Sequence, residues 1–301
     1  MVGPSARQMA VEHVMRDGHS SQRRACRLLR VARSTARYDQ AQRIGDEVLL
    51  KRIKQLADRH RRYGYRRVTV LLRREGMFVN VKRVHRLWKQ AGLGLPKKRP
   101  KRRHYGPKGA VVNKAQHPNH VWSYDFVEDR TAKGGRLKIL AVVDEYTREC
   151  LALHVDKRIT SQGVLSTLGW LFLLHGRPDH IRSDNGPEFV ANAVQQWIAG
   201  KGSSTLYIHP GSPWENAYIE SFNDKLRDEC LNMEVFKNGS EAREVIEAWR
   251  IEYNELRPHS SLNYQTPAAF AAQCRNSSRP TASLRCSTAR ENLQSNVILS
   301  T

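Results

Sequence analysis

Three acidic residues, Asp125, Asp184 and Glu220, have the side chains that a two-metal chemistry at a phosphodiester requires. Mg²⁺ prefers oxygen ligands, and two such ions about 4 Å apart activate an attacking hydroxyl and stabilise the leaving oxygen of an in-line displacement. Clustered carboxylates supply negative charge for the ions and repel one another without them. We therefore expect these residues to hold two Mg²⁺ ions, or Mn²⁺ in their place.

The segment VWSYDFV predicts a strand that places Asp125 on one face of a sheet. Its apolar and polar side chains alternate, so that Trp122, Tyr124 and Phe126 share one face. Ser123 and Asp125 then lie on the opposite face, because successive side chains of a strand point in opposite directions.

Asp184 ends the short predicted strand HIRSD, the kind of strand terminus at which α/β sheets hold ligands. The Asn185-Gly186 turn follows, and Pro187 can open the next helix. Asp144 ends another predicted strand near the same edge, and we interpret it as structural.

The helix that carries Glu220 has a predicted N-cap at Ser212. Successive residues of a helix are about 100° apart, which brings residues three or four positions apart to the same side. One sector of this helix contains four polar residues: Asn216, Glu220, Asn223 and Arg227. A single acid on a strand edge or a helix is usually a turn residue or a surface charge, but the joint pattern reverses that expectation.

Positive charge is concentrated in the first third of the chain. The net charge is +22, yet residues 1–108 contain 30 Lys and Arg against 7 Asp and Glu, whereas residues 109–301 contain 21 against 22. This asymmetry indicates a module that binds a polyanion, joined to a nearly neutral unit.

The basic third predicts two helical DNA-binding units. Residues 5–40 predict three short helices whose lengths fit a helix-turn-helix, with a plain three-helix bundle as the alternative. Residues 46–91 predict three more, with Asn80 as a cap and with Val48 and Val81 among the buried residues. The expected DNA-contacting cations are Arg33, Arg37, Arg66, Arg67, Arg73, Arg74, Arg83, Arg86, Lys97, Lys98, Arg99, Lys101, Arg102 and Arg103.

The rest of the chain predicts a mixed α/β sheet with helices on its faces, the order that an RNase H-like core requires. Three strands form a meander, and helices then alternate with strands. We divide the chain into a helix-turn-helix-like region (1–45), a second helical DNA-binding unit (46–93), a basic linker (94–116), the catalytic core (117–235), a helical extension (236–273) and a disordered tail (274–301).

Cysteines and histidines show no metal-binding pattern. The five cysteines include no CxxC pair, which argues against zinc and against a disulfide framework. We interpret the histidines, His117 and His120 included, as mainly structural, with His209 and His259 as candidate DNA neighbours. No apolar run is long enough for a membrane span and no signal peptide is visible, so we expect a cytoplasmic, nucleoid-associated protein.

WSYDF, SDNGPEF and PGSPWENAYIESFNDKLRDECLN together resemble the integrase core of bacterial insertion-sequence transposases of the second-reading-frame (OrfB) type, relatives of retroviral integrases. YGYRRVTVLLRREG is similar to that group's helical DNA-binding segment, and RPHSSLNYQTPAAF to its C-terminal signature. The resemblance covers about residues 45–272.

The resemblance implies a DDE triad of Asp125, Asp184 and Glu220, Mg²⁺-dependent 3′-end cleavage and strand transfer at inverted repeats. It also implies that Arg227 contacts DNA near the scissile phosphate, with Asn185 helping to orient it. The expected partners are double-stranded DNA, further copies of the chain in a synaptic complex and an upstream-frame protein or fusion.

Two other functions remain open at this point. One is a non-catalytic, sequence-specific DNA-binding regulator with a relict core. The other is an RNase H-like nuclease or resolvase, which would not need sequence-specific helices at its N-terminus.

Overall fold

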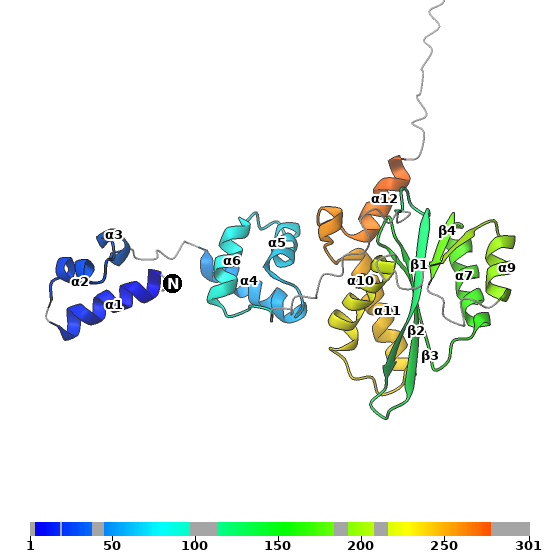
Figure 1. Ribbon diagram of the computed structural model, residues 1–301, viewed down its shortest axis with the longest axis horizontal. Helices are drawn as coiled ribbons and strands as arrows, with labels where there is room; N and C mark the ends of the chain where they lie inside the picture. The colour runs from blue at the N-terminus through cyan, green and yellow to red at the C-terminus, as the bar shows by residue number, and fades with distance from the viewer. Residues whose placement is uncertain are drawn as a thin grey trace, which may run out of the picture.

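The computed structural model describes residues 4–18, 20–37, 45–96, 114–183, 192–207 and 216–277. Figure 1 shows two small helical units followed by a larger α/β unit. Within the described ranges, no helix combines the length and the apolar character that crossing a membrane requires.

The first helical unit contains α1 (Pro4–Asp17), α2 (Gln22–Leu28) and α3 (Arg33–Ala36), as the sequence predicts. Ser21 caps α2 by accepting a hydrogen bond from the Arg24 N–H. Four buried residues form its small core: Val11, Ala25, Cys26 and Val31.

The second helical unit contains α4 (Asp46–Arg59), α5 (Tyr65–Arg74) and α6 (Val81–Gln90). The predicted cap is confirmed, because the Asn80 side chain accepts a hydrogen bond from the Lys82 N–H. The predicted burial of Val48 and Val81 is wrong, since they are 66% and 37% exposed. Val48 is the third residue of α4 and Val81 is the first residue of α6, so each lies at a helix start.

The α/β unit is built on a five-stranded sheet in the order β3-β2-β1-β4-β5. The strands are β1 (Val121–Arg130), β2 (Arg136–Asp144), β3 (Cys150–Asp156), β4 (His180–Ser183) and β5 (Ser204–Tyr207). The first three are antiparallel, whereas β4 pairs parallel with both β1 and β5. This is the predicted mixed sheet: a meander that continues into alternating helices and strands.

Helices cover both faces of the sheet (Figure 1). Helices α7 (Ser161–His175) and α9 (Asn192–Gly200) pack on the face that contains Trp122 and Tyr124. Helices α10 (Ala217–Leu226) and α11 (Gly239–Glu255) pack on the face that contains Val127 and Val143. The alternation read from VWSYDFV is confirmed, and Asp125 belongs to the α10 face.

The chain after α10 differs in detail from the expectation. Helix α10 begins at Ala217, after the expected cap Ser212, which lies outside the described residues. A π-helical turn, η2 (Arg227–Leu231), extends α10, and a short 3₁₀ turn, η3 (Ser260–Leu262), follows α11. Helix α12 (Pro267–Ser277) continues past residue 273, so the predicted boundary of the tail is placed too early.

The second helical unit docks on the α/β unit through polar contacts. Arg62 pairs with Asp228, and Arg67 pairs with Glu229 at 3.2 Å. Arg74 donates to the carbonyl oxygens of Leu256 and Tyr264 at 2.7 and 3.1 Å. These partners lie in η2 and beside α11, so the docked unit rests against the extension of the helix that carries Glu220.

Candidate active site

Asp125 lies in the middle of β1 and faces α10. Its Oδ2 accepts a hydrogen bond of 2.8 Å from the Asn223 side chain, and its Oδ1 accepts one from the Phe126 N–H at 2.8 Å. These bonds fix the plane of the carboxylate, and the side chain remains only partly buried. Asp125 is therefore held in one orientation at a place that a substrate can reach.

Glu220 lies on α10 one turn before Asn223, with its side chain exposed. Residues three positions apart lie on the same side of a helix, so Glu220 shares the side from which Asn223 reaches Asp125. Ile219, Phe222 and Leu226 are buried against the sheet and fix the rotation of the helix. The apolar strip of α10 thus brings the predicted polar sector to β1.

Arg227 continues this polar sector along β1. It begins η2, and its Nη2 donates to the Glu128 carbonyl oxygen at 3.0 Å. The side chain is otherwise exposed. The polar sector of α10 and η2 therefore contacts β1 at Asp125, through Asn223, and at Glu128, through Arg227.

Asp184 and Asn185 lie outside the described residues. The parallel register pairs Ser123 of β1 with Arg182 of β4. Ser123 precedes Asp125 by two residues, and Arg182 precedes Ser183, the last residue of β4. The end of β4 therefore lies beside the part of β1 that leads to Asp125. The assignment of Asp184 to the site stays a prediction.

A buried ion pair lies beneath this edge of the sheet. Arg182 contacts Glu145 at 3.1 Å, and both side chains are almost fully buried. Ser123 donates its hydroxyl to the same carboxylate. Burial raises the pKa of Glu145, and the Ser123 hydrogen bond and the Arg182 charge oppose that rise. The three residues connect the end of β2 to β1 and β4.

Asp144 has the structural role expected of it. Its carboxylate accepts hydrogen bonds from the backbone N–H groups of Asn119, Tyr146 and Thr147 at 2.7–3.0 Å. Burial raises its pKa, while these bonds act in the opposite direction. It is a turn residue of the β2–β3 connection.

Several cations expected to contact DNA have partners within the protein. Arg83 and Arg86 both pair with Asp46, at 2.8 and 2.6 Å. Arg67 and Arg74 contact the α/β unit, as described above. Arg33, Arg37, Arg66 and Arg73 are exposed. Contact of any of them with DNA stays a prediction, and the remaining cations lie outside the described residues: Lys97, Lys98, Arg99, Lys101, Arg102 and Arg103.

The histidines bring two further findings. His259 is only 5% exposed and its side chain belongs to the core, so its place as a DNA neighbour stays a prediction; His209 lies outside the described residues. His117, His120 and Asp179 come together, with one ligand atom of each within 4.8 Å of the others. The spacing His117-x-x-His120 is the signal in the sequence, but Asp179 joins it only through the fold.

The hydrogen bonds of this cluster argue against three free ligand atoms. His120 Nδ1 accepts a bond of 3.0 Å from the Gln116 N–H, which leaves the ring proton on its Nε2. The His117 Nδ1 lies 3.0 Å from the Pro118 carbonyl oxygen and must donate to it, so only its Nε2 faces Asp179, at 3.4 Å.

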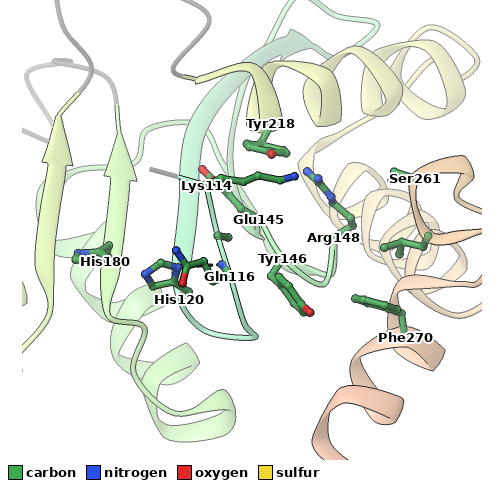
Figure 2. A pocket seen from close by; sticks show the side chains of 12 residues that line it. Lys114, Gln116, His120, Glu145, Tyr146, Arg148, His180, Tyr218, Ser261 and Phe270 are labelled. Atoms are coloured by element: carbon green, nitrogen blue, oxygen red, sulfur yellow. Dashed lines mark hydrogen bonds between the residues drawn. The ribbon is translucent and has the colours of Figure 1, made fainter. Parts of the chain in front are cut away.

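A cavity of about 860 Å³ opens beside the start of α10, at the ends of β1, β2 and β4. Figure 2 shows Lys114 and Arg148 converging beneath Tyr218, with Tyr146 and Phe270 along another side. The cavity combines cations with aromatic rings, which sequence reasoning did not bring together.

The residues at the α10–β1 contact fit a hard divalent cation. Asp125 and Glu220 supply carboxylate oxygens, which Mg²⁺ and Mn²⁺ prefer. The Asn223 hydrogen bond orients Asp125 from outside the ligand set, as neighbours of metal ligands commonly do. With phosphate oxygens and water as further ligands, this arrangement is suited to metal-assisted phosphodiester chemistry.

Known families match most of the chain. The family described as "Integrase core domain" matches residues 115–213 and, in a second form, residues 201–267. The family described as "HTH-like domain" matches residues 44–103, which include the second helical unit.

Insertion elements encode similar proteins. The chain is 44% identical to the insertion element IS407 31.7 kDa protein of Burkholderia multivorans, over 85% of this chain and 92% of the relative. It is 40% identical to the IS476 39.2 kDa protein of Xanthomonas euvesicatoria, over 91% and 79%. It is 29% identical to the transposase for IS904 of Lactococcus lactis, over 76% and 95%.

Among solved structures, the HTLV-2 integrase catalytic core domain with magnesium aligns with a TM-score of 0.39 and 20% identity, over 52% of this chain and 97% of that one. The simian T-cell lymphotropic virus intasome aligns with a TM-score of 0.47 and 16% identity, over 83% and 80%. These likenesses are too weak to carry an argument, whereas the sequence matches are extensive. The chain belongs to the integrase-core family of bacterial insertion-sequence transposases.

Proposed function

We propose that this protein catalyses metal-dependent 3′-end cleavage and strand transfer at the inverted repeats of its insertion sequence. The observation that carries the proposal is the bond from Asn223 to Asp125. It joins the polar sector of α10, with Glu220 and Arg227, to the one acidic residue in the middle of β1. A relict core would have no need to keep these groups together.

Asp125, Asp184 and Glu220 would hold two Mg²⁺ ions, or Mn²⁺ in their place. When bound, the ions would lower the pKa of the attacking hydroxyl and neutralise charge on the leaving oxygen. Asn223 keeps one Asp125 oxygen directed at α10. Arg227, anchored on the Glu128 carbonyl oxygen, has its remaining guanidinium donors available for a phosphate next to the scissile bond.

The protein's own contribution is positioning and electrostatics, as in phosphoryl transfer generally. Water would attack first, and the freed 3′-hydroxyl would attack target DNA next. Double-stranded DNA would be held by the cations of the helical units and by the segment 94–116. A homo-oligomer would join two ends in one complex, and an upstream-frame partner or fusion is a further element of the proposal.

The test is strand transfer by the full chain on labelled duplexes that carry the element's ends. We expect joined products with Mg²⁺ or Mn²⁺ and none with EDTA. Tight and specific end binding without products would instead favour the DNA-binding regulator. Faster cleavage of an RNA–DNA hybrid or a four-way junction than of the end duplex would favour the nuclease or resolvase.

Metal binding has a separate test. Clustered carboxylates repel one another, so an ion that binds them should stabilise the folded protein. Thermal melts should shift upward with Mg²⁺ or Mn²⁺, and the shift should shrink in Asp184→Asn. An equal shift in that variant would contradict the role of Asp184.

A further inference from the structure

A second cavity, of about 350 Å³, lies on the flank of α10 that faces away from Asp125. Cations from four separate places line it: Arg67 of α5, Arg148 of the β2–β3 turn, Lys225 of α10, and Arg257, which follows α11. The hydroxyls of Ser221, Ser260 and Ser261 line it as well, and none of its described lining residues is a carboxylate. We call this cavity the anion pocket.

The positive charge at the anion pocket is only partly balanced. Glu229 accepts two bonds of 2.6 Å from Arg257 and one of 3.2 Å from Arg67. Lys225 donates to the Ser221 carbonyl and hydroxyl oxygens at 2.6 and 2.8 Å, neither of which carries charge. Glu229 is thus hydrogen-bonded to two of the four cations, Arg67 and Arg257.

Arg148 is the pocket cation whose guanidinium is held by a ring contact and has a buried donor without a hydrogen bond. Its guanidinium stacks on the Tyr218 ring, with Cζ 4.1 Å from the ring centroid. Its Nε is buried and has no hydrogen-bond partner among the described residues. Burying a donor without a partner is costly, so this group is suited to a ligand that accepts hydrogen bonds.

Burial lowers the pKa of two nearby groups, and the cations of the anion pocket lower it further. The pKa of Lys225 is lowered to about 8 by burial and then by Arg257, Arg67 and Arg148, against the opposing effect of Glu229. The pKa of His259 is lowered to about 2 by burial and by the same cations together with Lys225. An anion in the pocket would offset the part of each shift that comes from the cations.

The surroundings indicate what kind of anion fits. The anion pocket shares Arg148, Tyr218 and Ser261 with the larger cavity of Figure 2. In that cavity the Tyr146 and Phe270 rings lie 5.8 Å apart. Cations beside exposed aromatic faces are the chemistry by which proteins hold single nucleic-acid strands, with phosphate on the cations and bases on the rings.

We propose that the anion pocket binds a backbone phosphate of a DNA strand that passes between the second helical unit and α10. The proposal rests on the proposed function, since it takes DNA as the substrate. Arg67 comes from the docked helical unit and Lys225 from the helix of Glu220. The phosphate would therefore contact the second helical unit and the α/β unit at the same time.

The test is equilibrium binding of an end duplex with a single-stranded extension, without divalent metal, over a range of salt concentrations. Arg148→Gln and Lys225→Gln should each weaken binding about tenfold and reduce the salt slope by roughly 0.7–0.9, the loss of one phosphate contact. Lys237→Gln removes an exposed cation just before the start of α11, outside the lining of the anion pocket, and is the matched control. Unchanged slopes in both pocket variants would overturn the proposal.

Lys225→Gln protects the test against misfolding, because it removes a cation that burial disfavours. Thermal melts with inorganic phosphate against chloride, at equal ionic strength, separate DNA from a free anion. Phosphate could raise the melting temperature of the wild type but not of either variant, while the salt slopes of DNA binding stay the same in all three proteins. That result would identify a small-anion site and would refute the DNA assignment.

The outcomes also separate this proposal from the catalytic one. Altered slopes in the pocket variants, with no strand transfer by the wild type, would uphold the pocket and reject the proposed reaction. Strand transfer by the wild type, with unchanged salt slopes of DNA binding in both variants, would uphold the proposed reaction and reject the pocket.

Discussion

The two polar flanks of α10 have opposite chemistry. One flank presents Glu220 and Asn223 to the Asp125 carboxylate of β1. The other presents Ser221 and Lys225 to a group of arginines. The apolar strip of Ile219, Phe222 and Leu226 lies between them and is packed against the sheet. One short helix therefore fixes both the acidic and the basic groups.

This difference separates two tasks that DNA-processing sites must combine. A flank of oxygen ligands attracts cations, and a flank of lysine and arginine attracts phosphates. Because both belong to one rigid helix, the distance between a held phosphate and the reacting one would be set by the helix itself. Four predictions test how far the flanks are independent.

The largest expected effect is on the acidic flank. Asp125→Asn or Glu220→Gln should lower the rate of strand transfer about 1,000-fold or more, because each removes a charged metal ligand. DNA affinity and its salt slope, measured without metal, should stay as in the wild type. A residual rate within about tenfold of the wild type would break the assignment.

The next effect concerns Glu229, the carboxylate that is hydrogen-bonded to Arg67 and Arg257 of the basic flank. Glu229→Gln should destabilise the fold by about 3 kcal/mol, because Arg257, whose side chain is 2% exposed, loses its carboxylate. Urea unfolding gives the free energy. The control is Glu247→Gln, whose carboxylate is 48% exposed beside Arg250 and which should cost less than about 1 kcal/mol. Equal losses in both variants would show that Glu229 has no special role.

A smaller effect is expected where the acidic flank meets β1. Asn223→Ala should raise the Mg²⁺ concentration for half-maximal activity about 10–100-fold, because Asp125 loses the bond that orients it. A positioning residue acts through metal affinity, so excess Mg²⁺ should restore most of the rate. Asn232→Ala, at an exposed position just past η2, is the control. A loss that excess metal does not restore would point to another role.

The smallest expected effect is on the pH dependence of folding stability, through Lys225 of the basic flank. Lys225 has a folded-state pKa of about 8, below its usual 10.5, so its charge destabilises the fold at neutral pH. Lys225→Gln should therefore be more stable by about 1 kcal/mol below pH 8, after allowance for partial solvent exposure. Burial sets most of this pKa shift, and Arg257, Glu229, Arg67 and Arg148, which remain in the variant, modify it.

The sign of the pH dependence is specific. Between pH 8 and 10.5 the unfolded state holds the Lys225 proton more tightly than the folded state. The wild type therefore gains stability relative to Lys225→Gln as the pH rises, and the advantage of the variant disappears by about pH 10.5. Melting curves of both proteins across this range give the difference, and a constant difference would contradict the prediction.

Local sequence patterns predicted the acidic flank well. Strict alternation in VWSYDFV placed Asp125 opposite Trp122 and Tyr124, and helical spacing placed Glu220 and Asn223 on one side of α10. Both inferences need only the geometry of one element. Helix starts were less predictable, because Val48 and Val81 precede the residues whose packing decides which side is buried.

The basic flank could not be predicted in this way. Arg148, Lys225 and Arg257 are far apart in the chain and are brought together by the α/β fold, and Arg67 joins them because the second helical unit docks beside α10. Their types are common on any DNA-binding surface, so the sequence analysis predicted a DNA contact for Arg67 and did not single out Arg148. Asp184 and Asn185, outside the described residues, stay predictions.

The buried Arg182–Glu145 pair has a consequence for assembly of the sheet. Strand β4 has only four residues, too few for apolar side chains alone to define its alignment with β1. A slip by one position would turn the Arg182 guanidinium to the other face and leave the buried Glu145 without its ion-pair partner. The ion pair thus favours the observed alignment of β4 with β1. A buried contact away from the α10–β1 site therefore fixes the position at which the chain leaves β4 toward Asp184.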